Sequence, residues 1–235
     1  MSESQAIASP GSYTTFFKDL PTHSGDLPRS DGALRVLAAP YAPAEISEET
    51  YAAFVKTLLI RTGDLSKDFT HAILGIVTEI HELQNAVDEV NAVEETGDIF
   101  FYTEALCQVL TDLQGSYQGL DDQRLFREVH QLQDYCGEVG VQDAISAGCN
   151  YLLDTAKAWI AYGRIPDDTD SLFCTATALG VVAAASNPDH PISDIQRVIR
   201  ANMAKLMKRY KGGKFTELEA MNRDLEAERE VLASA

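Results

Sequence analysis

The sequence predicts an all-α protein, organised as an antiparallel helical bundle, and three observations lead to that fold class. Signals for helix starts recur along the chain, and no segment carries a competing strand signal. The third observation is a stripe of apolar residues at alternating spacings of four and three, which is the pattern of an amphipathic helix. Its members are Phe69, Ile73, Ile76, Ile80, Leu83, Val87 and Val90.

The first expected elements are an arm and a short helix. Residues 1–45 are rich in Ser, Pro, Gly and Asp, so we expect an N-terminal arm with little regular structure. Residues 46–235 are expected to form one all-α domain. Its first helix should begin near Ser47 and stop around Gly63.

The second and third helices are expected to form a tight antiparallel hairpin. Ser66 is the predicted cap of the second helix, which carries the apolar stripe. Asn91 followed by Glu94 resembles a capping box, so a third helix should begin there and run to about Leu110.

Five more helices complete the prediction. Residues 143–163 should form a helix closed by Gly163 and Pro166, after one helix around residues 125–135 in the less regular segment 111–140. Residues 168–185 predict a nearly all-apolar helix. Ser193 is expected to open the next one, and Thr216 with Glu219 forms a second capping box that should open a charged tail helix.

Composition and charge exclude several classes of partner. The 235 residues are 45% hydrophobic and 23% charged, as is ordinary for a soluble globular protein. A formal net charge of −17 argues against a nucleic acid or an anionic membrane as the partner. No apolar run approaches the roughly 20 residues of a membrane span, and the N-terminus does not resemble a signal peptide. The four cysteines are widely spaced and suggest no zinc site or disulfide framework, so a cytoplasmic location is expected.

Two pairs of acidic residues are the main candidates for chemistry. Glu79 and Glu82 lie on the second predicted helix, Glu95 and Asp98 lie on the third, and the spacing of three puts each pair on one helix face. Carboxylates brought together repel one another unless a positive charge lies between them. Hard cations such as Mg²⁺ take oxygen ligands, and helical bundles build metal sites from inward side chains on facing helices. The sequence predicts a site for a hard divalent cation such as Mg²⁺, with a solvated acidic face as the alternative.

The segment around these pairs resembles a known family. GIVTEIHELQNAVDEVNAVEETGDIFFYTEAL, residues 75–106, is similar to the signature of the MazG-like, all-α nucleoside triphosphate pyrophosphohydrolases, in which an ExxE helix and an ExxD helix are separated by a short gap. The matching positions are Gly75, Glu79, Glu82, Leu83, Glu95, Gly97 and Asp98. The resemblance implies a four-helix core with additional helices and assembly as a homodimer or homotetramer.

The same resemblance implies a reaction. The four acidic residues would be the catalytic and metal-binding residues, holding Mg²⁺ or Mn²⁺ with more than one ion per site. Water would attack the α-phosphorus of a nucleoside triphosphate and release pyrophosphate, leaving the monophosphate. One of the glutamates would serve as the base, and the sequence does not assign which.

A basic segment near the C-terminus supplies candidate phosphate contacts. Seven of the 19 basic residues lie between Arg197 and Lys214, and residues 202–215, NMAKLMKRYKGGKF, resemble the N-x-x-KL-x-x-RY…F segment of phage-type members of the same family. Asn202, Lys205 and Arg209 share a helix face and, with Tyr210, are predicted to bind substrate phosphates. The alternative is a solvated basic face at a helix C-terminus, which the helix dipole favours in any case.

Lys157 is the last candidate. It shares a helix face with Leu153 and Ile160, and the surrounding segment is similar to family members that carry a lysine here. We expect its ammonium to reach a phosphate or a carboxylate. The alternative is a stem that lies along apolar surface with its charge in water.

Two hypotheses of function remain open at this stage. The first is a metal-dependent pyrophosphohydrolase whose substrate is a nucleoside triphosphate, with a purine deoxynucleotide such as dGTP favoured by the long arm and the phage-like C-terminal segment. The second is a non-catalytic helical-bundle protein that binds a nucleotide or a protein partner.

Overall fold

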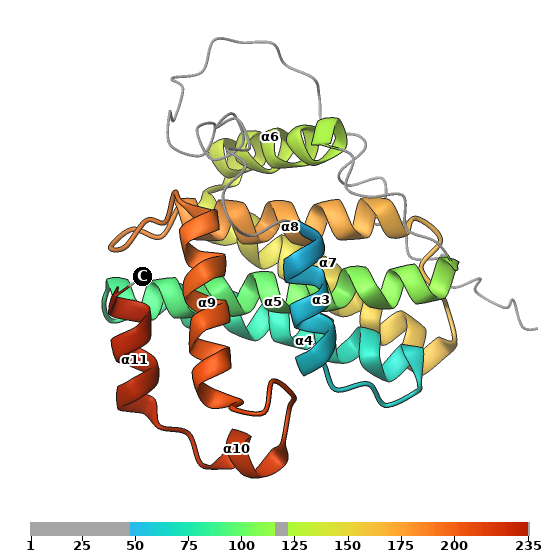
Figure 1. Ribbon diagram of the computed structural model, residues 1–235. Coiled ribbons are helices and arrows are strands. Elements are labelled where there is room, and N and C mark those ends of the chain that lie inside the picture. The colour runs from blue at the N-terminus through green and yellow to red at the C-terminus, as the bar shows by residue number, and fades with distance from the viewer. Residues whose placement is uncertain (1–47, 116–121, 235) are drawn as a thin grey trace, which may run out of the picture.

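The computed structural model describes residues 48–115 and 122–234, and every regular element within them is a helix (Figure 1). The all-α fold class is therefore confirmed, while the predicted arm, residues 1–45, lies outside the described residues. The helices are α3 (Glu48–Leu58), α4 (Leu65–Gln84), α5 (Glu89–Gln114), α6 (Asp122–Val139), α7 (Val141–Tyr162), α8 (Thr169–Ala185), α9 (Ile195–Arg209), α10 (Glu217–Met221) and α11 (Leu225–Ser234). None of these described helices has the length and apolar character needed to cross a membrane.

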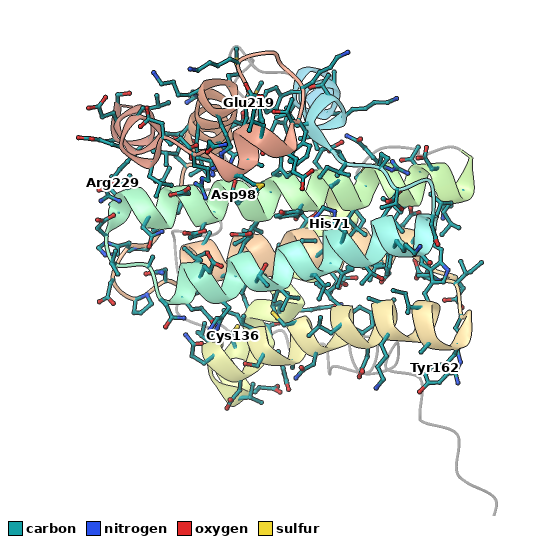
Figure 2. The ribbon with its side chains drawn as sticks, turned by 90° about the horizontal axis from the view of Figure 1, so that it is seen from below. His71, Asp98, Cys136, Tyr162, Glu219 and Arg229 are labelled. Atoms are coloured by element: carbon teal, nitrogen blue, oxygen red, sulfur yellow. The ribbon has the colours of Figure 1, made fainter. Side chains whose placement is uncertain are left out.

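The helices form layers around the α4–α5 hairpin. α4 and α5 run antiparallel and are joined by residues 85–88, as predicted. α7 and α8 pack on one side of this pair, with α6 outside them, whereas α3, α9 and α11 lie on the other side of α5 (Figures 1 and 2). The hairpin thus has one face toward an apolar core and another toward the C-terminal helices.

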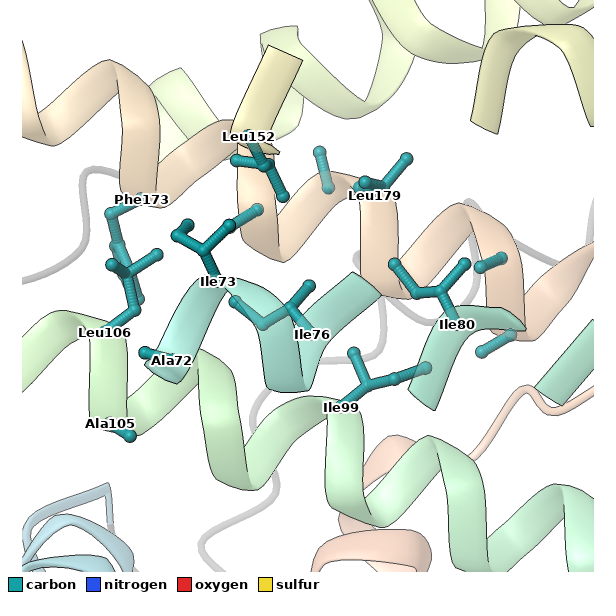
Figure 3. Close-up of a cluster of buried hydrophobic side chains, with 14 of the residues drawn as sticks. Ala72, Ile73, Ile76, Ile80, Ile99, Ala105, Leu106, Leu152, Phe173 and Leu179 are labelled. Atoms are coloured by element: carbon teal, nitrogen blue, oxygen red, sulfur yellow. The ribbon is translucent and has the colours of Figure 1, made fainter. Parts of the chain in front are cut away.

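The main core lies between α4, α5, α7 and α8. Ile73, Ile76 and Ile80 of α4 meet Leu152 of α7 and Leu179 of α8, and side chains of α5 close the cluster (Figure 3). Burying a side chain of this size contributes about 1.5 to 3 kcal/mol. The largest fully buried side chains of the described residues are apolar with one exception, which is Lys205 of α9.

Several helix starts differ from the prediction, and each difference has the same cause. α4 is capped by Asp64 rather than Ser66, because the Asp64 carboxylate accepts hydrogen bonds from the backbone N–H groups of Ser66 and Lys67. α5 begins after Asp88, whose carboxylate accepts from the N–H of Asn91, so the predicted Asn91 capping box is wrong. In both helices the carboxylate lies two or three residues upstream of the predicted cap, and its negative charge is favourable at the positive end of a helix.

The hairpin turn, the start of α9 and the tail show three further corrections. α4 ends at Gln84, so Val87 is not part of its apolar stripe and is 81% exposed in the connection. α9 is capped by Asp194 and not by Ser193. The capping box of Thr216 is confirmed, but it opens only the short helix α10, and α11 follows as a separate helix instead of one continuous tail helix.

Two glycines of the acidic motif allow other elements to approach closely. A Cβ atom on Gly75 would lie 2.3 Å from Cγ of Tyr102, so glycine lets that ring rest on the backbone of α4. A Cβ atom on Gly97 would lie 2.7 Å from Cβ of Asn202, so glycine lets α9 approach α5. The two residues were placed by resemblance alone, and the packing gives each a physical reason.

Replacing Gly97 by Ala should therefore lower stability. The overlap with Asn202 has to be relieved by moving α9, at a cost of about 1 to 3 kcal/mol, which corresponds to a fall in Tm of about 3 to 10 °C. Gly137→Ala in α6 is the matched control: a Cβ there meets nothing within 4 Å, and alanine favours the helix. Thermal unfolding followed by circular dichroism would contradict the packing argument if both variants melted at the same temperature.

Candidate active site

A cavity of about 640 Å³ lies where the α4–α5 hairpin faces α9 and the end of α3. Figure 2 places Asp98 between α5 and the C-terminal helices, and His71 further along the α4–α5 pair. Carboxylates, two arginines and a largely apolar wall share this cavity. Its lining residues include Glu79, Glu82, Glu94, Glu95, Asp98, Arg209, Tyr210, Arg223, His71, Phe101, Tyr102 and Phe215.

Three of the four predicted metal ligands converge in the cavity. Each of Glu79, Glu82 and Glu95 offers a carboxylate oxygen, and these oxygens lie within 4.8 Å of one another. Helical spacing places the two α4 residues on one face, and the tight turn brings α5 alongside. Glu95 is buried, and its Oε1 accepts a hydrogen bond of 2.5 Å from Nδ2 of Asn91.

The pKa values in this cluster reflect burial first and the crowding of negative charge second. Burial raises the pKa of Glu79 to about 9, and the charge of Asp98 and the contact with Glu95 add to the effect. Burial also raises the pKa of Glu95 to about 7, although its hydrogen bond with Glu79 works in the opposite direction. Without a cation in the cavity, the Glu79–Glu95 pair therefore retains a proton at neutral pH.

These pKa shifts predict how the stability of the metal-free protein depends on pH. A glutamate in the unfolded chain titrates near pH 4.3, whereas Glu79 keeps its proton to about pH 9 in the folded protein. The folded state thus binds more protons between these values, and the free energy of unfolding falls as the pH rises. With metal chelated, we expect Tm to fall by up to about 4 °C per pH unit between about pH 5 and 9.

The control for this pH dependence is Glu79→Gln, which removes the titrating group and should flatten the slope of Tm against pH. The measurement is thermal unfolding in the presence of a chelator at each pH. An identical slope in the wild type and the variant would contradict the raised pKa of Glu79.

Asp98, the fourth predicted ligand, is held by basic and polar side chains of α9. Nζ of Lys205 lies 2.6 Å from Oδ2 and 2.8 Å from Oδ1 of Asp98, and Nδ2 of Asn202 donates to Oδ1 at 2.6 Å. Lys205 is 0% exposed and its ammonium also lies 3.4 Å from Glu94. The structure thus places Lys205 and Asn202, predicted as phosphate contacts, directly on a carboxylate of the site.

Arg209 and Tyr210, which were predicted as substrate contacts, line the cavity. Arg209 is not free, because Nε and Nη2 bind the two oxygens of Glu228 at 2.9 and 2.7 Å. Arg223 also lines the cavity and bridges Glu228 and Glu94, with Nη2 distances of 2.8 and 3.2 Å. Sequence analysis missed Arg223, Glu228 and Glu94, because they resemble ordinary charges of a tail helix and of the motif helix.

Lys157 does not join this cavity. It lies on the exposed face of α7, its side chain is 65% exposed, and its ammonium is 3.7 Å from the carboxylate of Asp154. The lysine thus pairs with a neighbour on its own helix at the surface, and not with the expected anion in the bundle.

A largely apolar wall completes the cavity and was also missed. The ring of Tyr102 makes edge-to-face contacts with the rings of His71 and Phe101, with distances between ring centroids of 5.6 and 5.5 Å. Leu59 and Ile60 extend the wall from the segment after α3. No sequence spacing marks it, because its members come from separate elements.

The segment after α3 is fixed by a buried acid at the start of α4. Oδ1 of Asp68 accepts from the backbone N–H and the hydroxyl of Thr62, and Oδ2 accepts from Nε of Arg61 at 2.9 Å. Burial alone would raise the pKa of Asp68, but these hydrogen bonds hold it below its usual value. Asp68 thus holds residues 61 and 62, and with them the adjoining part of the apolar wall, in place.

Comparisons of the chain with protein-family models, with curated proteins and with solved structures found no match. The resemblance of residues 75–106 to the MazG-like signature therefore stays a prediction, and a function has to be inferred from the chemistry of the cavity.

Proposed function

We propose that the protein is a metal-dependent nucleoside triphosphate pyrophosphohydrolase, which converts a nucleoside triphosphate and water to the monophosphate and pyrophosphate. The observation that carries the proposal is the convergence of Glu79, Glu82 and Glu95 within 4.8 Å in a cavity that Arg209 and Arg223 also line. The carboxylates could bind metal cations and the arginines could bind the phosphates of an anionic ligand, so the cavity suits a metal–nucleotide complex.

The donor set fits Mg²⁺ or Mn²⁺. All three converging side chains offer carboxylate oxygens, which these cations prefer as ligands. Asp98 lies on α5 one helical turn after Glu95. The raised pKa values of Glu79 and Glu95 indicate that the cluster lacks compensating positive charge. Glu79, Glu82, Glu95 and Asp98 would hold more than one ion, and bound metal would supply Lewis-acid polarisation of a phosphoryl oxygen and a more acidic water.

The side chains of the protein would divide the remaining work. With metal bound, Glu79 and Glu95 would be ionised, and one of them would accept a proton from the attacking water. The two guanidinium groups would bind phosphate oxygens. The apolar wall with His71 and Tyr102 would pack against the nucleobase, because aromatic rings stack on bases of any sequence.

The cavity volume of about 640 Å³ falls in the range of about 300 to 1,000 Å³ typical of small-molecule sites. A purine deoxynucleotide such as dGTP is the proposed substrate within this class. A homodimer or homotetramer is the proposed assembly, and light scattering coupled to gel filtration would measure it.

The test is an end-point assay over the eight common ribo- and deoxynucleoside triphosphates, with Mg²⁺ and separately with Mn²⁺. Chromatography should separate monophosphate, diphosphate, pyrophosphate and phosphate. We expect equal amounts of monophosphate and pyrophosphate from a preferred nucleotide. Release of diphosphate and single phosphate would contradict the proposed position of cleavage, and no product with either metal would contradict hydrolysis.

A second candidate is a nucleotide-binding protein without catalysis. The observation that favours it is the engagement of Asp98 by both Lys205 and Asn202. For such a protein we expect a nucleotide with Mg²⁺ to raise Tm while the assay yields no product.

A further inference from the structure

Glu228, a buried carboxylate of α11, binds both arginines of the cavity at once. Its side chain is 3% exposed, with Arg209 at 2.9 and 2.7 Å and Arg223 at 3.2 and 2.8 Å. Arg209 ends α9, and Arg223 lies in the segment between α10 and α11. One acid of the last helix thus gathers two cations that come from separate elements.

These pairs belong to a longer chain of alternating charges. The order is Asp98, Lys205, Glu94, Arg223, Glu228 and Arg209, and each neighbouring pair lies within ion-pair distance. The three acids and three bases balance, and both end members line the cavity. None of these pairs includes Glu79, Glu82 or Glu95, so the network leaves the uncompensated charge on the three converging carboxylates.

The geometry of the pairs fixes how the guanidinium groups face. The two carboxylate oxygens of Glu228 accept hydrogen bonds from Nε and Nη2 of Arg209, one each. Its Oε2 also accepts from Nε and Nη2 of Arg223. Nη1 takes no part in either pair. An arginine whose Nε and Nη2 are already hydrogen-bonded to Glu228 loses less conformational entropy when it binds an anion than an arginine that can rotate freely.

We propose that Glu228 is a positioning residue that presents Arg209 and Arg223 to the terminal phosphates of a triphosphate, so that α11 is part of the substrate site. The class of ligand rests on the proposed function. In the competing interpretation, the same pairs serve only to attach α11 to α9, which it also contacts through packing.

The experiment compares Glu228→Gln with Glu226→Gln in the full chain. Glu226 lies on the same helix but is exposed, so its replacement changes the net charge equally without touching the arginines. The probe is inorganic tripolyphosphate in the presence of Ca²⁺, with binding measured by calorimetry; it contains no nucleoside and therefore tests the phosphate contacts alone. Affinity for Mn²⁺, measured separately, reports the carboxylate cluster of α4 and α5.

For Glu228→Gln we expect tripolyphosphate affinity to fall at least tenfold, with Mn²⁺ affinity within twofold of the wild type, and we expect Glu226→Gln to change neither. Wild-type affinity for tripolyphosphate in Glu228→Gln would overturn the proposal, and so would an equal loss of both affinities, which is the mark of general structural damage. If Glu228→Gln fails to fold, Glu228→Asp keeps the charge but withdraws the carboxylate by one methylene. Its tripolyphosphate affinity should fall at least threefold, and wild-type affinity there would overturn the proposal too.

The same measurements separate this proposal from the proposed reaction. A wild-type protein that binds tripolyphosphate but releases no pyrophosphate from any nucleotide would remove the hydrolase function and leave the role of Glu228 standing. A wild-type protein that does not bind tripolyphosphate would overturn the role of Glu228, whatever the assay shows.

Discussion

Replacement of Glu79 by Gln should lower the rate of pyrophosphate release from the preferred nucleotide by at least about a hundredfold. The amide keeps the size of the side chain and its contact with Glu95, but it cannot act as an anionic metal ligand or accept a proton from water. The measurement is the initial rate at saturating nucleotide and Mg²⁺. Glu138→Gln, an exposed carboxylate of α6 outside the cavity, is the control with the same change of net charge and should keep the wild-type rate.

The same variant should have an opposite effect on stability. Burial, together with the nearby Asp98 and Glu95, disfavours the charge of Glu79. Its replacement by Gln should therefore raise the Tm of the metal-free protein at pH 8, while reducing the rise in Tm that Mg²⁺ or Mn²⁺ produces. A ligand at 100 times its Kd adds about 2.7 kcal/mol, or about 5 to 10 °C in Tm for a domain of this size. If millimolar metal leaves the Tm of the wild type unchanged, the metal site is contradicted.

The sequence was sufficient for the parts of the site that depend on local spacing. Glu79 and Glu82 share a helix face by their spacing, and the short turn after Gln84 brings Glu95 beside them. The all-α class and the α4–α5 hairpin follow from the same local patterns. The exact helix starts do not, because Asp64 and Ser66 are both good caps and only the folded backbone decides which carboxylate or hydroxyl faces the free N–H groups.

The parts that the sequence did not predict are contacts between distant residues. Lys205 and Asp98 were both expected in the site, but their pairing joins residues 107 apart in the chain. Glu228 and Arg223 resemble a solvated charged helix until α11 packs against α9 and buries the carboxylate. Spacing along one helix cannot reveal a charge that is compensated from another helix.

Lys205→Met should destabilise the protein strongly, because Lys205 is the fully buried partner of Asp98 and Glu94. Methionine fills a similar volume but leaves Asp98 without its cation and Glu94 with Arg223 alone. Breaking a buried pair in this way costs about 3 to 5 kcal/mol, which corresponds to a fall in Tm of about 6 to 20 °C. Lys208→Met, an exposed lysine of the same helix, is the control and should melt close to the wild type.

A second substitution, at Asp98, tests whether its uncompensated charge causes the loss of stability. If the loss of stability arises from the stranded charge of Asp98, then adding Asp98→Asn to Lys205→Met should recover part of the lost Tm, since the two residues are in direct contact. Mn²⁺ should also raise the Tm of Lys205→Met more than that of the wild type, because the freed carboxylate lies beside the converging glutamates. A Lys205→Met protein that melts within 2 °C of the wild type and has only a raised KM would show instead that the ammonium acts on the substrate phosphates. In that case the ion pair with Asp98 would be a resting contact that the nucleotide replaces.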